Sequence, residues 1–220
     1  MTSTPSTILF DIDGTLVDSN YLHVEAWSQA FADVDLAVDS WRIHRAIGMD
    51  SAKLLDALAP QLSERERAKA KRHHSRQYGR MSKELRAFDG ARDVVRELAD
   101  RGLTVVLATS APEDELANLR ALLDVEEEID VVTSSADVDT AKPSPDIVQV
   151  ALDRAGASAD DSVFVGDTVW DVEAAGRAGV RCIGVLSGGI SEGELRDAGA
   201  IAVYSDVVDM LARSADLGRS

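Results

Sequence analysis

The chain carries the sequence ILFDIDGTLVDS at residues 8–19. Its first three residues are apolar, as in a parallel strand that is buried on both faces. Asp11 and Asp13 follow, and residues two apart on an extended chain point to the same side. Two carboxylates so close repel each other unless a cation or a shared proton relieves the repulsion. The stretch therefore predicts a divalent metal site at the strand's carboxyl end, with Mg²⁺ as the cation because it prefers oxygen ligands. A turn with solvated acids is the alternative.

The composition is that of a water-soluble, acidic protein. The 220 residues are 45% hydrophobic and 28% charged, with a net charge of −16, which argues against nucleic acid and anionic membrane surfaces as partners. No apolar run is long enough to span a membrane, and residues 1–7 lack the regions of a signal peptide. The single cysteine, Cys182, cannot form an internal disulfide. We expect a cytoplasmic protein of one domain with an insertion, or of one large and one small domain.

The segment that follows the first strand is predicted to be helical. Residues 20–85 contain no convincing strand, and we expect helices at 21–33, 41–47, 51–58 and 63–85, the last beginning with a capping box at Ser63. A stretch of this length between two strand–helix units is too long for a loop. We therefore expect residues 17–87 to form an inserted helical cap.

Beyond residue 90 the pattern alternates between strand and helix, which predicts a parallel α/β sheet. Strands are expected at 104–108, 129–133, 162–165, 181–186 and 201–204, and helices at 91–101, 113–123, 145–155, 171–178 and 206–213. Residues 1–16 and 88–220 would then form one core, a doubly wound sheet of the Rossmann-like kind.

Polar residues mark the ends of two later strands and the start of one helix. Thr109 and Ser110 end one apolar strand, where a hydroxyl and a backbone amide can hold a phosphate oxygen or simply cap a helix. Lys142 lies in the sequence AKPSP before a helix, where an isolated lysine is usually a solvated charge. Asp167 follows Gly166 at another strand end, and Asp171 falls in the first turn of the next helix, a favourable place for any acid.

Together these four motifs, in this order, resemble those of the haloacid dehalogenase-like hydrolase superfamily, in the branch of phosphoglycolate phosphatase and β-phosphoglucomutase. The resemblance covers residues 8–213 and implies phosphoryl transfer to a carboxylate. It implies Asp11 as nucleophile and Asp13 as general acid and base. It also implies one Mg²⁺ bound by Asp11, the backbone carbonyl of Asp13 and Asp167, with Asp171 beside these ligands. Thr109, the Ser110 amide and Lys142 would hold the phosphoryl oxygens.

The cap is expected to select the substrate. His23 and Trp27 resemble a pair near the hinge of the mutase, although a histidine on a helix face is often only packed or solvated. The segment AIGMDS around Gly48 resembles the specificity loop of this cap type, but no arginine follows the glycine to hold a second phosphate. The sequence thus favours a phosphatase of a small phosphorylated metabolite, such as phosphoglycolate or a sugar monophosphate. The alternatives are a mutase and a non-catalytic phospho-ligand binding protein; monomer and homodimer stay open.

One segment of the expected cap has a charge opposite to that of the whole chain. Residues 65–86 hold nine basic and two acidic residues, so this segment has a net charge of +7 within a chain of −16. Two interpretations stay open. The segment is a solvated helix face that balances an acidic protein, or it guides anionic substrates towards the cleft.

Overall fold

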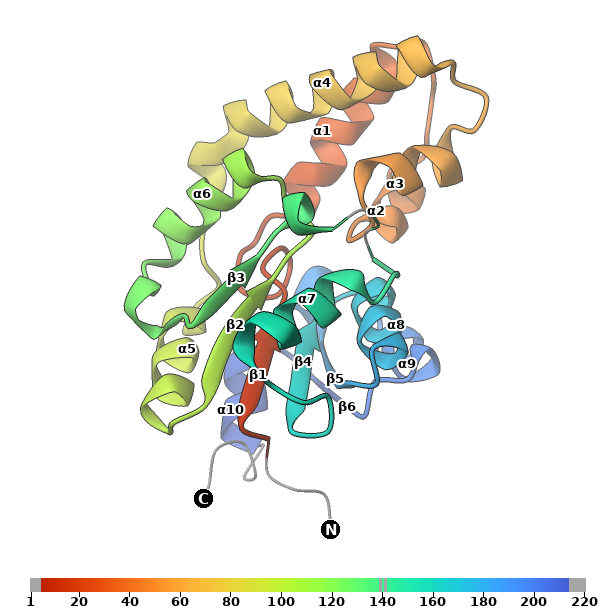
Figure 1. Ribbon diagram of the computed structural model, residues 1–220. Helices are drawn as coiled ribbons and strands as arrows, with labels where there is room; N and C mark the ends of the chain where they lie inside the picture. The colour runs from red at the N-terminus through yellow and green to blue at the C-terminus, as the bar shows by residue number, and fades with distance from the viewer. Residues whose placement is uncertain (1–4, 139, 141, 214–220) are drawn as a thin grey trace.

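The fold was determined from a computed structural model, which describes residues 5–138, 140 and 142–213. Its centre is a six-stranded parallel sheet in the order β3-β2-β1-β4-β5-β6 (Figure 1). The strands are β1 (Thr7–Phe10), β2 (Thr104–Ala108), β3 (Val131–Thr133), β4 (Ser162–Gly166), β5 (Arg181–Val185) and β6 (Ala202–Tyr204). The predicted doubly wound α/β sheet is confirmed.

Strand β1 occupies the middle of the sheet because every one of its side chains is apolar or small enough to be buried. Ile8 pairs with Val105 of β2 on one side and with Val163 of β4 on the other. All four residues of β1 are buried, as expected for a parallel strand covered on both faces. The strand therefore delivers Asp11 to the carboxyl edge of the sheet, between the ends of its two neighbours.

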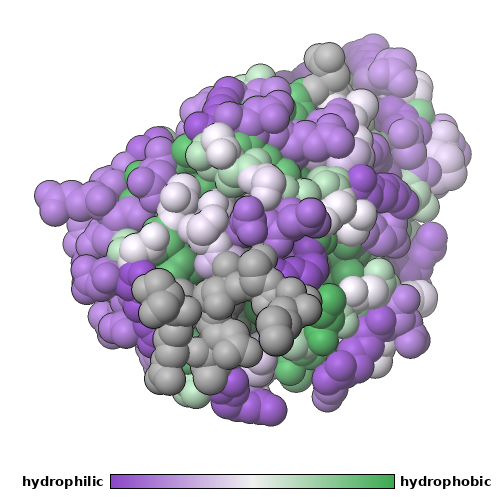
Figure 2. Space-filling view, turned by 60° about the horizontal axis from the view of Figure 1, so that its bottom comes forward, coloured by the Kyte–Doolittle hydropathy of each residue, from purple (hydrophilic) through white to green (hydrophobic). Residues whose placement is uncertain are grey.

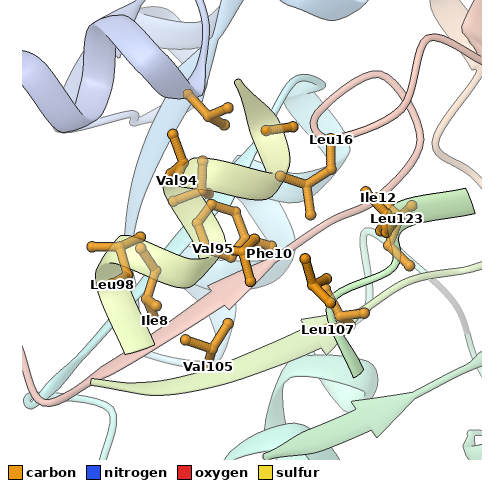
Figure 3. Packing of buried hydrophobic residues seen from close by; sticks show 14 of the residues in the cluster. Ile8, Phe10, Ile12, Leu16, Val94, Val95, Leu98, Val105, Leu107 and Leu123 are labelled. Carbon is orange, nitrogen blue, oxygen red and sulfur yellow. The ribbon is translucent and has the colours of Figure 1, made fainter. Parts of the chain in front are cut away.

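Helices cover both faces of the sheet. One face packs against α5 (Ala91–Asp100), α6 (Glu113–Leu123) and α10 (Val207–Arg213), and the other against α7 (Asp146–Ala155), α8 (Val169–Arg177) and α9 (Glu192–Ala198). Figure 3 shows the first core, in which Ile8 and Phe10 of β1 lie against Val95 and Leu98 of α5. Ile8 and Phe10 pack in this core, whereas Leu9 packs in the core on the other face, so β1 contributes to the apolar cores on both faces of the sheet.

Four of the five α-helices between β1 and β2 form a separate layer over the carboxyl ends of the strands (Figure 1). They are α1 (Asn20–Ala32), α2 (Ser40–Ala46), α3 (Ser51–Leu58) and α4 (Glu64–Met81). We call α1 to α4 the helical segment. It has its own apolar cluster, which includes Trp27, Phe31, Leu54, Leu55 and Ala70. Its helices are therefore held together independently of the two cores beside the sheet.

The two chain segments that join the helical segment to the sheet run side by side. Val17 and Ala87 form an antiparallel bridge, and the amide of Asp18 donates to the carbonyl of Arg86 at 2.9 Å. The Arg86 guanidinium also forms an ion pair of 2.8 Å with the Asp18 carboxylate. The chain thus leaves the sheet and returns to it at one place.

Several elements differ from their predicted bounds. Strand β3 begins at Val131 because the side chain and backbone of Asp130 already hydrogen-bond to Val105. Helix α4 ends at Met81 and continues as the 3-10 helix η1 (Ser82–Glu84), and further 3-10 turns are η2 (Glu126–Glu128), η3 (Ser135–Asp137) and η4 (Leu186–Gly188). Helix α9 (Glu192–Ala198) was not predicted, although Ser191 and Glu194 form its capping box and Gly199 ends it.

The start of β1 and helix α10 lie at the end of the molecule away from the helical segment (Figure 1). Figure 2 shows this end of the molecule, where hydrophilic residues cover much of the visible surface. Residues 1–4 and 214–220, the outer ends of the predicted core, are outside the described part of the chain. Within the described part, we find no helix with the length and apolarity needed to cross a membrane.

Candidate active site

A cavity of about 200 Å³ lies between the carboxyl ends of the strands and the helical segment. The sheet side of its wall includes Asp11, Asp13, Thr109, Ser110 and Lys142. The helical segment adds the predicted residues His23, Trp27 and Gly48, together with others that include Lys71 and His74. The structure therefore brings the predicted side chains from both parts of the chain to one space, except Asp167 and Asp171, which lie beneath it.

A buried ion-pair triad forms the floor of this cavity. The Nζ atom of Lys142 lies 2.7 Å from Oδ1 of Asp11 and 2.8 Å from Oδ1 of Asp171. Burial alone would lower the pKa of Lys142, but the two carboxylates outweigh it and raise that pKa. Burial raises the pKa of Asp11 to about 7, with further contributions from Asp171 and Asp13 against the opposing effect of Lys142. Lys142 is therefore a fixed positive charge next to Asp11.

Asp167 is held from the opposite side by the loop after β1. Thr15 Oγ1 donates to its Oδ1 at 3.0 Å, and Asn20 Nδ2 donates to its Oδ2 at 2.8 Å. Burial and the charges of Asp171 and Asp11 raise the pKa of Asp167 well above its usual value. The two hydrogen bonds use both carboxylate oxygens, so the orientation of Asp167 is fixed before any ligand arrives.

Three of the acids are close enough to share a cation. Asp11, Asp167 and Asp171 each offer a carboxylate oxygen, and these oxygens lie within 4.8 Å of one another. All three residues are buried, so water screens their repulsion poorly. A divalent cation with oxygen ligands fits this group, because it would offset the burial and the repulsion that raise the pKa values of Asp11 and Asp167. Asp171 is also tied to Thr168, whose hydroxyl donates to Asp171 Oδ2 at 2.6 Å in a capping box.

Asp13 has a different set of partners, although only Ile12 separates it from Asp11. Ser19 Oγ donates to Asp13 Oδ1 at 2.6 Å, and His23 Nε2 lies 3.5 Å from the same oxygen. Burial opposes ionisation, but His23 and Ser19 outweigh it and hold the pKa of Asp13 below its usual value. The side chain of Asp13 is therefore turned towards α1 rather than towards the three clustered acids.

Comparison with known proteins accords with this geometry. Residues 8–185 match the family model of the haloacid dehalogenase-like hydrolases. The chain belongs to this family. It is 30% identical over 218 residues to a phosphoglycolate phosphatase of Rhodospirillum rubrum, covering 94% of this chain and 89% of the relative. It is 27% identical over 199 residues to a phosphorylated carbohydrates phosphatase of Thermotoga maritima, covering 89% and 92%. The crystal structure of a hydrolase from Pseudomonas syringae superposes with a TM-score of 0.92 at 32% identity, covering 97% and 100%.

The β2 end of this haloacid dehalogenase-like hydrolase presents one hydroxyl that is ready for a ligand. Thr109 Oγ1 accepts a hydrogen bond from the Ala111 amide at 3.1 Å, so it caps the turn. Ser110 Oγ is buried and has no hydrogen-bond partner within the described residues. A buried polar atom of this kind needs a partner. From the sequence, we expect ligand binding by the backbone amide of Ser110. The unpaired side-chain hydroxyl of Ser110 is a second candidate to bind the ligand.

His23 and Trp27 belong to an aromatic stack that joins α1 to α4. The His23 ring stacks on Tyr78 with centroids 3.9 Å apart, and Trp27 stacks on His74 at 4.3 Å. The His23 Nδ1 and His74 Nε2 atoms are 3.1 Å apart. Burial lowers the pKa of His74, with a further effect of His23. The stack therefore connects Asp13 with the wall that α4 provides.

Gly48 brings the helical segment against the core loop after β4. Its φ of +95° favours glycine, and a Cβ atom there would lie 2.8 Å from Thr168 Oγ1. Nearby, His44 Nε2 lies 2.8 Å from the Gly188 carbonyl, and Trp170 Nε1 donates to the carbonyl of Arg45 at 3.1 Å. The predicted specificity loop and helix α2 before it are therefore packed directly on Thr168 and Trp170, which lie between Asp167 and Asp171, and on the turn η4.

Sequence reasoning missed Asn20, Glu115, Lys71 and His74 as site residues. None of them belongs to a strand-end motif, and Glu115 reaches the cavity from the first turn of α6. One signal was available for the pair on α4. Lys71, His74 and Tyr78 are spaced three and four apart, which places them on one face of a helix.

Proposed function

We propose that this haloacid dehalogenase-like hydrolase is a Mg²⁺-dependent phosphatase of a small phosphorylated metabolite, either phosphoglycolate or a sugar monophosphate. The observation that carries the proposal is the pairing of Asp11 with Lys142 at 2.7 Å on a cavity that Asp13 also lines. The names of the two relatives described above, a phosphoglycolate phosphatase and a phosphorylated carbohydrates phosphatase, support this substrate class.

The first chemical step makes an aspartyl-phosphate. A carboxylate oxygen of Asp11 forms a bond to phosphorus, and the bond from phosphorus to the ester oxygen breaks. Asp13 gives a proton to that leaving oxygen. Because its low pKa keeps Asp13 ionised at rest, it receives this proton from His23, whose Nε2 lies 3.5 Å from Asp13 Oδ1 and whose pKa Asp13 raises against burial. Lys142 stays protonated beside Asp11 and stabilises charge on the transferring group, and Ser110 Oγ can donate to a phosphoryl oxygen. In the second step a water gives its proton to Asp13 and attacks phosphorus, which frees Asp11 and inorganic phosphate.

Mg²⁺ would be held by Asp11, Asp167 and the backbone carbonyl of Asp13. When bound, it supplies positive charge that offsets the negative charge of phosphate and nucleophile. Asp171 would act through Lys142, to which it is bound at 2.8 Å, rather than as a direct ligand. Thr15 and Asn20 keep the Asp167 carboxylate in one orientation.

We further propose that residues 17–87 act as a cap domain over a core of residues 1–16 and 88–220. The separate apolar cluster of the helical segment and the paired connections at Val17 and Ala87 support this division. The position of Lys71, His74 and Gly48 in the cavity wall supports substrate selection by the cap.

The test combines one substitution with removal of the metal. Asp11→Asn keeps the side-chain shape but removes the attacking charge, so kcat for phosphate release should fall at least about 1000-fold. Wild-type activity should be lost in chelator and return with Mg²⁺, whereas Ca²⁺ should not restore it, because it prefers more ligands at longer distances.

Asp160→Asn changes an exposed acid in the same way and serves as the matched control. Circular dichroism of both variants shows whether the fold is retained. Near-normal turnover by folded Asp11→Asn protein would exclude Asp11 as the nucleophile. Full activity in chelator would remove the metal from the mechanism.

A further inference from the structure

Lys71 is a half-buried cation in the cavity wall that none of the described residues neutralises. It projects from α4 and lines the cavity together with His74 and Ser75, one turn further along the same helix. Within the described part of the chain, its ammonium forms no hydrogen bond and no ion pair. Its neighbours on α4 differ, since Lys69 pairs with Asp33 at 3.0 Å and Arg67 with Asp56 at 2.6 Å.

The acids that line the same cavity are engaged elsewhere. Asp11 is bound to Lys142, and the Asp50 carboxylate accepts hydrogen bonds from the amides of Ala52 and Lys53 at the start of α3. Glu115 and Asp13 lie near His23 and Tyr78, where their charges raise the pKa values of both rings. Tyr78 is seven residues from Lys71, which corresponds to about 10 Å along a helix axis.

The α4 wall therefore has two chemically different ends. The end near Tyr78 lies close to Asp13 and Glu115, whereas the end at Lys71 carries an unpaired positive charge in the cavity wall. A partly desolvated ammonium without a partner is unfavourable, and a bound anion would relieve this cost. Lysine suits such a role because its flexible stem can follow a small ligand.

We infer that Lys71 is a specificity-determining residue that binds a second anionic group, a carboxylate, of the phosphate monoester whose phosphoryl group is held at Asp11 and Lys142. This inference rests on the proposed function and makes it narrower. The preferred substrates are small phosphorylated carboxylic acids rather than esters of neutral sugars.

The test compares two substrates that differ in one group. Phosphoglycolate carries a carboxylate, and ethylene glycol monophosphate carries a neutral hydroxymethyl group at the same position. Lys71→Met should lower kcat/KM for phosphoglycolate at least about tenfold, mainly through KM, because a charge-assisted contact is lost. It should change kcat/KM for ethylene glycol monophosphate less than about twofold, and Lys71→Arg should retain most of the preference.

Lys83→Met is the matched control, because Lys83 is an exposed lysine in the same basic segment and does not line the cavity. It should leave both substrates unchanged at about 0.2 M salt, where long-range effects are screened. Equal losses on both substrates, or no loss on phosphoglycolate, would overturn the inference while leaving the phosphatase proposal intact. If no phosphate monoester is hydrolysed, the phosphatase proposal fails. In that case, calorimetric titration of phosphoglycolate into wild-type and Lys71→Met protein tests whether Lys71 binds the carboxylate. Equal affinities of the two proteins for phosphoglycolate would overturn the inference.

Discussion

At the scale of single residues, the site separates two aspartates that are neighbours in sequence. Burial raises the pKa of Asp11 to about 7, whereas His23 and Ser19 outweigh burial and lower that of Asp13. The first acid is surrounded by other acids and one lysine, and the second faces hydrogen-bond donors. Neighbouring carboxylates in such different environments lose their protons in different pH ranges, and so they can take different roles in one reaction.

Glu115 permits a test of these electrostatic effects at a residue other than Asp11, the proposed nucleophile. Burial raises its pKa from 4.5 to about 7, with a lowering contribution from His23 and a raising one from Asp13. Between pH 4.5 and about pH 7, Glu115 is protonated more often in the folded protein than in the unfolded chain. The free energy of unfolding therefore falls as the pH rises through this range. Glu115→Gln cannot titrate. Its Tm relative to wild type should therefore be higher at pH 8 than at pH 4.5.

Thermal melts across this pH range measure the difference. Glu127→Gln, which alters an exposed acid, is the matched control. A Tm difference between Glu115→Gln and wild type that does not vary with pH would show that the pKa of Glu115 is the same in the folded and the unfolded protein.

At the scale of secondary-structure elements, the short turns after the strands fix the acids more than the strands themselves do. The 3-10 turn η4 after β5 lies directly on Asp167, and a Cβ atom added at Gly188 would be 1.7 Å from Asp167 Oδ2. The Gly188 carbonyl also accepts from Asn20 Nδ2 at 3.4 Å. The backbone of this turn therefore forms part of the wall that holds the Asp167 carboxylate.

Gly188→Ala should displace Asp167, because Thr15 and Asn20 leave that carboxylate no free direction in which to move. We expect at least about a tenfold loss of Mg²⁺ affinity, together with a lower Tm. Mg²⁺ titration followed by calorimetry measures the first effect. Gly193→Ala in α9 is the control, since no atom lies within 4 Å of the added Cβ and its helix should be slightly stabilised. Unchanged metal affinity in Gly188→Ala would exclude this role for the turn.

The elements that carry the motifs were predictable from sequence for a physical reason. Apart from Thr104, every residue of β1, β2 and β4 is buried, so these strands appear as short apolar runs, and Asp11, Thr109 and Asp167 follow the runs directly. Glu115 was not predictable, because it reaches the cavity through packing between segments that are distant in sequence. For Lys71, the spacing to His74 and Tyr78 indicates a shared helix face, but not that this face lines the cavity. Helix α9 was missed for a different reason. It has only seven residues, and its one fully buried side chain, Leu195, gives no apolar period.

At the scale of the whole molecule, charge is distributed unevenly between the two layers. The chain has a net charge of −16, while residues 65–86, mostly in α4, carry +7. Arg72, Arg76 and Arg80 are exposed and lie one turn apart on α4, on a face different from that of His74 and Tyr78. These arginines can affect a ligand in the cavity only through their long-range field.

Reversing all three arginines to Glu should therefore lower kcat/KM about threefold or more at low salt and leave kcat unchanged. The difference from wild type should disappear as salt screens exposed charges. The triple change to Gln should produce a smaller effect of the same kind, since it removes half of the charge difference. Steady-state kinetics across a salt series measures all three proteins. Coinciding kcat/KM values at every salt concentration would leave a solvated helix face as the only interpretation.

The two chain segments that join the helical segment to the sheet, paired at Val17 and Ala87, have a consequence for evolution and protein engineering. Because the chain departs and returns through neighbouring, hydrogen-bonded residues, the order and register of the six strands do not depend on the length of what lies between them. The helical segment can therefore be exchanged, lengthened or shortened without changing the order of the strands in the sheet. If the helical segment selects the substrate, as proposed above, replacing this one contiguous stretch would change the ligand preference while the residues at the strand ends keep their places.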